Sequence, residues 1–165
     1  MIAGERIVLY PLEEADLRLL ATNIHAFELK TGLDYEGEDL AGQELQEIMI
    51  HQADQIILDP NHWLWHTFWL MVVHGKAIVG SLCFKGPAKK GEVEIGYGVS
   101  ENHQGHRYAT EAVGMLCDWA LTQNGVVAVL AETEAANLAS IRVLEHNHFV
   151  FTHSLNEFHW WKKTF

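Results

Sequence analysis

Hydrophobic and polar positions change their period several times along the chain, which predicts strands alternating with helices. Residues 5–10 have the pattern of a short strand that ends at Pro11. Residues 12–27 have a helical pattern, with acidic side chains in the first turn where the helix dipole favours them. After a polar loop, apolar residues recur at helical spacing over residues 39–58, and Asp59-Pro60 ends this second helix.

The middle of the chain predicts three strands. Aromatic and β-branched residues dominate 62–84, with His74-Gly75-Lys76 as a hairpin turn between two strands that are apolar on both faces and therefore central. Residues 91–99 alternate strictly, which predicts a third strand. Its two faces carry Val93, Ile95, Tyr97 and Val99 on one side and Glu92, Glu94, Gly96 and Gly98 on the other. Glycines inside a strand often mark the close approach of a ligand or another backbone.

The last third predicts a helix over residues 109–121 that stops at Asn124-Gly125. The elements expected after it are a strand over 126–131, a helix over 137–147 and a strand pair over 149–155 and 158–164. The full order, β-αα-β-β-β-α-β-α-β-β, predicts an α/β fold with a mixed sheet flanked by helices, and residues 1–165 are expected to form one domain.

Composition narrows the class of protein. The 165 residues are 48% hydrophobic and 20% charged, as expected for a compact globular chain. No apolar run reaches the roughly 18 residues of a membrane span, and charged residues near the start interrupt any signal peptide, so a cytoplasmic protein is expected. The 2 cysteines lack CxxC spacing, and the 11 histidines form no HExxH motif, so no metal site is expected.

Acidic residues concentrate at the beginning of the chain. Residues 1–60 hold 13 Asp and Glu against 3 Lys and Arg, whereas residues 61–165 hold 9 against 8. This balance disfavours nucleic acid and anionic membranes as partners and favours a cationic one. The alternative is an acidic surface that serves solubility alone. The residues expected to attract a cation are the loop residues Asp34, Glu36, Glu38 and Asp39.

The most informative stretch is EIGYGVSENHQGHRYATEA, residues 94–112. It passes from the glycine-bearing strand through a polar loop into a helix. Such a junction presents unpaired backbone N–H groups and the positive end of a helix dipole, so it can hold a phosphate or pyrophosphate. The alternative is a plain joint whose N–H groups are hydrated.

Three segments resemble the GNAT superfamily of N-acetyltransferases, particularly ribosomal-protein alanine acetyltransferases and related antibiotic or polyamine acetyltransferases. Residues 5–16 resemble the opening of that branch, and EIGY with ATEA resembles its strand and acetyl-CoA helix. NLASIRVLEHNHF, residues 137–149, is similar to its Asn-x-x-Ser-x-Arg-x-Leu-Glu segment. The resemblance implies a GNAT fold and acetyl transfer from acetyl-CoA to a primary amine of a protein N-terminus, polyamine, aminoglycoside or small metabolite. The alternative is a catalytically weak or inactive module that binds acyl-CoA.

The resemblance also implies how the donor is held. The family motif Gln/Arg-x-x-Gly-x-Gly/Ala maps onto residues 104–109, whose amides would hold the pyrophosphate, and the preceding strand end would bind the pantetheine arm. The implied cofactor residues are Tyr97, Gly98, Val99, Gln104, Gly105, His106, Arg107, Tyr108, Ala109, Thr110 and Asn137. Arg107 and His148 stand where the family usually has glycine. An arginine at that place can itself bind a phosphate.

Two side chains are the candidates for proton transfer. Glu94 is the expected base, because a partly desolvated carboxylate can take the proton that an ammonium must lose before it attacks. Glu92, about 7 Å away on the same face, is the alternative, and both could be ordinary strand carboxylates. The tyrosine that many family members use to protonate the thiolate falls at Leu144, which leaves Ser140 or water for that role. The oligomeric state is open, with a homodimer among the options.

Overall fold

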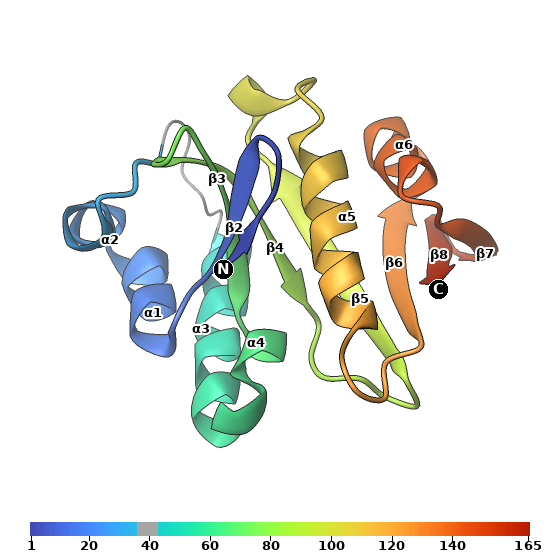
Figure 1. Ribbon diagram of the computed structural model, residues 1–165, viewed down its shortest axis with the longest axis horizontal. Coiled ribbons are helices and arrows are strands. Elements are labelled where there is room, and N and C mark those ends of the chain that lie inside the picture. The colour runs from blue at the N-terminus through green and yellow to red at the C-terminus, as the bar shows by residue number, and fades with distance from the viewer. Residues whose placement is uncertain (36–42) are drawn as a thin grey trace.

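The computed structural model describes residues 1–35 and 43–165. Its strands form one sheet in the order β1-β2-β3-β4-β5-β6-β8-β7, with β5 and β6 parallel and the other neighbours antiparallel (Figure 1). The strands are β1 (Ile2–Ala3), β2 (Ile7–Pro11), β3 (Phe68–Val73), β4 (Ala77–Phe84), β5 (Glu92–Val99), β6 (Ala128–Glu134), β7 (Val150–Leu155) and β8 (Phe158–Thr164). The predicted mixed α/β sheet is confirmed.

Helices cover both faces of this sheet, because each central strand is apolar on both sides. The helices are α1 (Glu14–Thr22), α2 (Ile24–Thr31), α3 (Gln43–Leu58), α4 (Trp63–His66), α5 (Tyr108–Leu121) and α6 (Leu138–His146), with short 3-10 turns at Pro60–His62 and Glu101–His103. One apolar cluster joins α1, α2 and α3 to the sheet through residues such as Phe27, Met49 and Leu70. A second joins α5 to the opposite face through residues such as Leu116 and Met71. No helix in the described ranges has the length and hydropathy that crossing a bilayer requires.

The predicted element order is confirmed, with local differences. The helix expected over residues 12–27 breaks at Asn23, whose side-chain oxygen accepts a hydrogen bond from Ala26 N at 3.0 Å and so starts α2. Residues 63–66, expected as strand, form α4, because Trp65 turns into the core against Phe84 and Trp119. The short β1, which pairs with β2, was not predicted. Of the helix expected over 39–58, the part before residue 43 lies outside the described residues.

The sheet opens between the carboxyl ends of its two parallel strands. Pairing of β5 with β6 extends as far as Ile95 and Ala131. Beyond that point β5 continues to Val99 beside β4, and β6 continues to Glu134 beside β8. Helix α5 begins after the loop that leaves β5, so its N-terminus lies at this opening. Crevices at the carboxyl ends of parallel strands are common ligand sites in α/β proteins.

Candidate functional site

A cavity of about 600 Å³ lies at the opening of the sheet, between the end of β5, the start of α5 and one face of α6. It gathers all but two of the residues that the sequence indicated for cofactor binding and catalysis. The predicted residues that line it are Tyr97, Gly98, Val99, Gln104, Gly105, Arg107, Tyr108, Ala109, Thr110, Asn137 and Ser140. The two that do not line it are His106 and Glu94.

The cavity wall carries positive charge. Arg107 and Arg142 line it together with His103 and His146, and none of the described residues that line it is an Asp or Glu. The chain as a whole has a formal net charge of −11. A cationic wall in such an acidic protein produces a local field that favours a polyanionic ligand.

The backbone of the loop before α5 is shaped to present N–H groups. Gly105 and Arg107 have φ values of +78° and +63°, both in the left-handed region. Arg107 therefore takes the conformation expected of the glycine it replaces, and it precedes α5 without a side-chain cap on the first amides. A left-handed residue beside right-handed ones turns successive N–H groups toward one point, which makes an anion-binding concavity.

His106 stabilises this loop from outside the cavity. Its Nδ1 lies 2.9 Å from Gln104 O and 3.2 Å from His103 O. Its ring stacks on that of Tyr108 with 5.4 Å between the centroids. The side chain predicted to bind the cofactor therefore contacts the loop itself.

Tyr97 and Ser140 meet across the cavity. Tyr97 Oη lies 2.7 Å from Ser140 Oγ, and it donates to Ser140 O at 3.2 Å. Burial raises the pKa of Tyr97 to about 12, although the hydrogen bond from Ser140 acts in the opposite direction. Both hydroxyls are therefore protonated at neutral pH. Asn137 caps α6 by accepting from Ser140 N at 3.0 Å, which holds Ser140 in place.

The two candidate carboxylates lie away from the cavity on the strand face that carries the glycines. Glu94 forms an ion pair with Lys85, and its buried Oε1 accepts no hydrogen bond from the described residues. Glu92 is bound to Lys162 Nζ at 2.6 Å. Glu94 and the cavity residue Gly98 share a face at a separation of about 13 Å along the strand. A proton would therefore pass between them through water.

The sequence reasoning missed the part of the cavity wall that α6 provides. Ala139, Arg142, Val143 and His146 line the cavity in addition to the predicted residues. They recur at intervals of three and four residues, which places them on one face of the helix. Helical spacing from the capping Asn137 was therefore the signal that could have found them.

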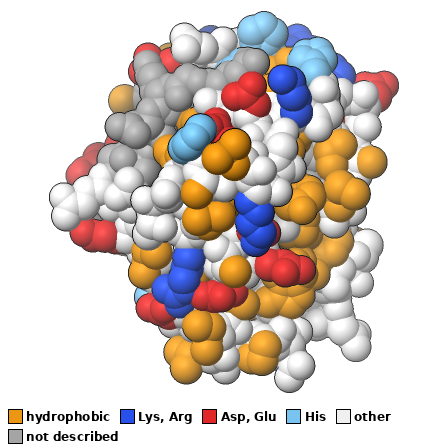
Figure 2. Space-filling view, turned by 90° about the vertical axis from the view of Figure 1, so that its left-hand side faces the viewer, with side chains coloured by type: hydrophobic (Ala, Val, Ile, Leu, Met, Phe, Trp, Pro, Cys, Tyr) orange, Lys and Arg blue, Asp and Glu red, His pale blue; other side chains and the backbone are white. Residues whose placement is uncertain are grey.

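The acidic loop is described only in part. Asp34 pairs with Ala77 through an isolated bridge, and its carboxylate lies 3.8 Å from Lys76 Nζ. Glu36, Glu38 and Asp39 lie outside the described residues. On the face shown in Figure 2, acidic side chains lie beside basic ones rather than in one continuous patch. Within residues 1–35 and 43–165, no three His, Cys, Asp or Glu side chains converge as a metal site requires.

Comparisons with known proteins agree with this geometry. The family model for the acetyltransferase (GNAT) domain matches residues 6–150. The chain is 34% identical over 109 residues to the uncharacterised N-acetyltransferase YjdG of Bacillus subtilis (strain 168). That match covers 65% of each chain, so it spans slightly less than two thirds of the relative.

Solved acetyltransferases share the fold at low sequence identity. RimL, a ribosomal L7/L12 alpha-N-protein acetyltransferase in complex with coenzyme A, has a TM-score of 0.68 at 16% identity, covering 98% of this chain and 95% of RimL. A chimera of spermidine N-acetyltransferase SpeG from Vibrio cholerae and hSSAT has a TM-score of 0.66 at 16% identity, covering 97% of this chain and 96% of the chimera. Because the family match also spans the strand, loop and helices that form the cavity, this chain belongs to the GNAT family of acetyltransferases.

Proposed function

We propose that this chain transfers the acetyl group of acetyl-CoA to a primary amine. The observation that carries the proposal is the cavity at the sheet opening, which joins a helix N-terminus, two arginines and no described carboxylate in a protein of net charge −11. Coenzyme A is a polyanion at its nucleotide end, so these features suit it. The thioester of acetyl-CoA supplies the acetyl group in activated form.

The residues around the cavity fit the donor in three parts. The amides of residues 105–109 face the pyrophosphate, and the Arg107 and Arg142 side chains provide additional phosphate contacts. The end of β5, Tyr97 to Val99, extends past its pairing with β6, so its backbone groups on that edge are available to the pantetheine amides. Orienting donor and acceptor in this way contributes several kcal/mol to the rate.

Proton transfer requires an acceptor for the ammonium proton and a donor for the departing sulfur. In this proposal Glu94 receives the first proton through water, and Lys85 keeps its carboxylate ionised at neutral pH. Ser140, hydrogen-bonded to the Tyr97 hydroxyl, donates the second. Because Tyr97 Oη is itself a donor, the pair can replace the proton that Ser140 gives up.

The acceptor is proposed to be a cationic amine. Two proteins with this fold carry the names alpha-N-protein acetyltransferase and spermidine N-acetyltransferase, and both names refer to amine acceptors. The 13 acidic residues among the first 60 provide a field that attracts such a molecule.

Release of free thiol from acetyl-CoA, measured across a panel of amines, tests the activity. The panel contains an alanine-terminated peptide, spermidine and an aminoglycoside. Saturable thiol release with at least one amine is expected. Binding of coenzyme A without thiol release from any amine would instead support the inactive acyl-CoA module.

Substitution of Glu94 tests the base. Glu94→Gln keeps the shape and removes the proton acceptor, so the rate at neutral pH is expected to fall between about 10²-fold and about 10⁴-fold with little change in acetyl-CoA affinity. Glu92→Gln, two positions away on the same face, tests the alternative base. A pH profile of the rate that Glu94→Gln leaves unaltered would contradict the assignment.

A further inference from the structure

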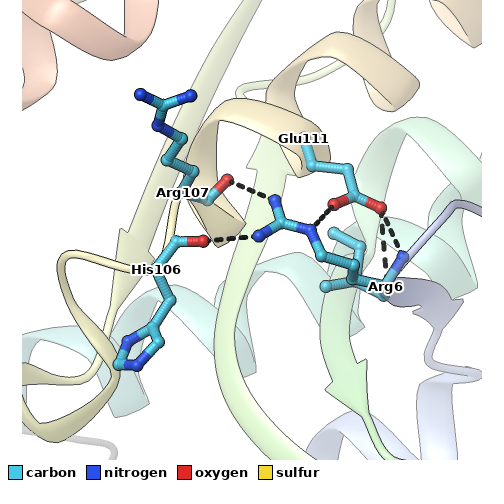
Figure 3. Close-up of polar contacts among 5 residues, drawn as sticks. Arg6, His106, Arg107 and Glu111 are labelled. Carbon is cyan, nitrogen blue, oxygen red and sulfur yellow. Dashed lines mark hydrogen bonds and ion pairs between the residues drawn. The ribbon is translucent and has the colours of Figure 1, made fainter.

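The loop that presents amides to the cavity is held from behind by one side chain. Arg6, in the turn between β1 and β2, donates from Nη1 to His106 O at 2.8 Å and from Nη2 to Arg107 O at 3.5 Å (Figure 3). Its guanidinium also lies over the Tyr108 ring, 5.6 Å from the centroid. Arg6 does not line the cavity, whereas Arg107 and Tyr108 do.

These two bonds determine where the following N–H groups point. The C=O and N–H of one trans peptide point in opposite directions, and no described peptide is cis. Because the carbonyls of His106 and Arg107 turn toward Arg6, the amides of Arg107 and Tyr108 turn away from it, toward the cavity. Figure 3 shows the Arg107 side chain directed away from the Arg6 guanidinium.

Glu111 holds Arg6 in this position. Its Oε2 accepts from Arg6 Nε at 2.9 Å, and its Oε1 accepts from Arg6 N at 2.9 Å and from Ile7 N at 3.4 Å. Burial alone would raise the pKa of Glu111, but these hydrogen bonds lower it below the usual range. The carboxylate in the first turn of α5 is therefore ionised and paired with Arg6.

The turn that carries Arg6 lies directly on α5. A Cβ atom added to Gly4 would be 2.5 Å from Met115 Sδ and 2.7 Å from Glu111 Oε1, so a larger residue would push the turn away. Gly4 N also donates to Ile7 O at 2.9 Å, which closes the turn. The short β1 strand thus brings Arg6 within reach of a loop a hundred residues later in the chain.

We propose that Arg6, held by Glu111, is a positioning residue that orients the Arg107 and Tyr108 amides for the phosphates of coenzyme A. The inference rests on the proposed donor site and deepens it. The Arg6 side chain is 47% exposed, and ion pairs at such exposure contribute little to stability. Its effect therefore falls on anion affinity and not on folding.

The experiment compares the affinities for coenzyme A and for pantetheine, which lacks the phosphates, in wild type and in Arg6→Gln. Binding of coenzyme A is expected to weaken by about tenfold in the variant, since charge-assisted amide contacts become misaligned, while pantetheine binding stays the same. Arg18→Gln is the matched control, because Arg18 also pairs with two carboxylates but lies between α1 and α3, far from the loop in sequence. This control is expected to leave both affinities unchanged.

Arg6→Lys separates orientation from charge. Lysine keeps the positive charge but cannot bridge two carbonyls and a carboxylate with one planar group, so coenzyme A affinity should still fall. Because this variant is the milder change, it also carries the test if Arg6→Gln fails to fold. Wild-type coenzyme A affinity in Arg6→Lys would overturn the orientation role.

Two further outcomes keep this inference distinct from the proposed function. If wild type binds coenzyme A no better than pantetheine, the proposed phosphate site itself is wrong. If wild type prefers coenzyme A and Arg6→Gln retains the full preference, the donor site stands and the role of Arg6 is wrong. Equal weakening of both ligands would show that Arg6 is merely structural.

Discussion

Two side-chain-bearing residues hold backbone conformations that favour glycine. Arg107 has φ +63° before α5 and His148 has φ +62° after α6, and both stand where the family resemblance implies glycine. The left-handed region costs an ordinary residue about 1–2 kcal/mol. Arg107 lines the cationic cavity, so its side chain offers a ligand contact that glycine lacks. The exposed His148 lies outside that cavity.

His148→Gly is therefore expected to stabilise the protein. The free energy of unfolding should rise by about 1 kcal/mol, because relief of the left-handed strain outweighs the added freedom of the unfolded chain. Chemical denaturation measures the change. Asn156→Gly is the control: Asn156 has φ +55°, but asparagine tolerates this region and little gain is expected. Equal gains in the two variants would contradict the explanation.

Contact between α5 and α6 determines the width of the cavity. Asn147, just after α6, donates from Nδ2 to Thr110 O at 3.0 Å and to Val143 O at 2.9 Å, so one amide joins the two helices. A Cβ atom added to Gly114 of α5 would be 2.8 Å from Asn147 Oδ1. The helices therefore approach closely because position 114 has no side chain.

Gly114→Ala is expected to destabilise the protein by about 1–3 kcal/mol through overpacking. This sign is diagnostic, because alanine in a helix is otherwise about 1 kcal/mol more favourable than glycine. The variant should also bind coenzyme A more weakly, since α5 and α6 both line the cavity. Thermal unfolding and a coenzyme A titration measure the two effects. A more stable variant with unchanged affinity would show that the close approach does not matter.

Charge is distributed unevenly over the whole molecule. Most of the net charge of −11 comes from the first 60 residues, while the cavity wall is cationic. Several described carboxylates of this part are paired, including Asp16 with Lys30 at 2.5 Å and Asp54 with Arg18 at 2.6 Å. The field that remains acts over a distance and not through one described acidic patch.

Salt is therefore expected to weaken the use of a cationic acceptor. Raising the ionic strength from about 0.01 M to about 0.15 M shortens the screening length from about 30 Å to about 8 Å, so the KM for a polycation such as spermidine should increase. A monoamine is the matched control, because its smaller charge makes its KM less sensitive to salt. Steady-state kinetics at saturating acetyl-CoA measure both. Parallel or flat responses would return the acidic residues to a role in solubility.

Local patterns were sufficient for most of the elements and much of the cavity. The period of apolar residues predicted β5, α5 and α6 because each element buries a face that recurs at its own spacing. The predicted cavity residues are mostly contiguous, from Tyr97 to Thr110, so one strand, loop and helix carry them together. Asn137 was recognisable as a cap for the same reason, since capping involves residues a few positions apart.

Contacts between distant segments depended on the packing of the whole chain. The bond from Arg6 to His106 joins residues 100 positions apart, and nothing in either local pattern indicates it. The ion pair of Glu94 with Lys85, the turn of Trp65 into the core and the Tyr97–Ser140 hydroxyl pair are of the same kind. Periodicity reports which face of an element is buried but not which element covers it. Side chains from separate elements meet only when the sheet order and helix packing bring those faces together.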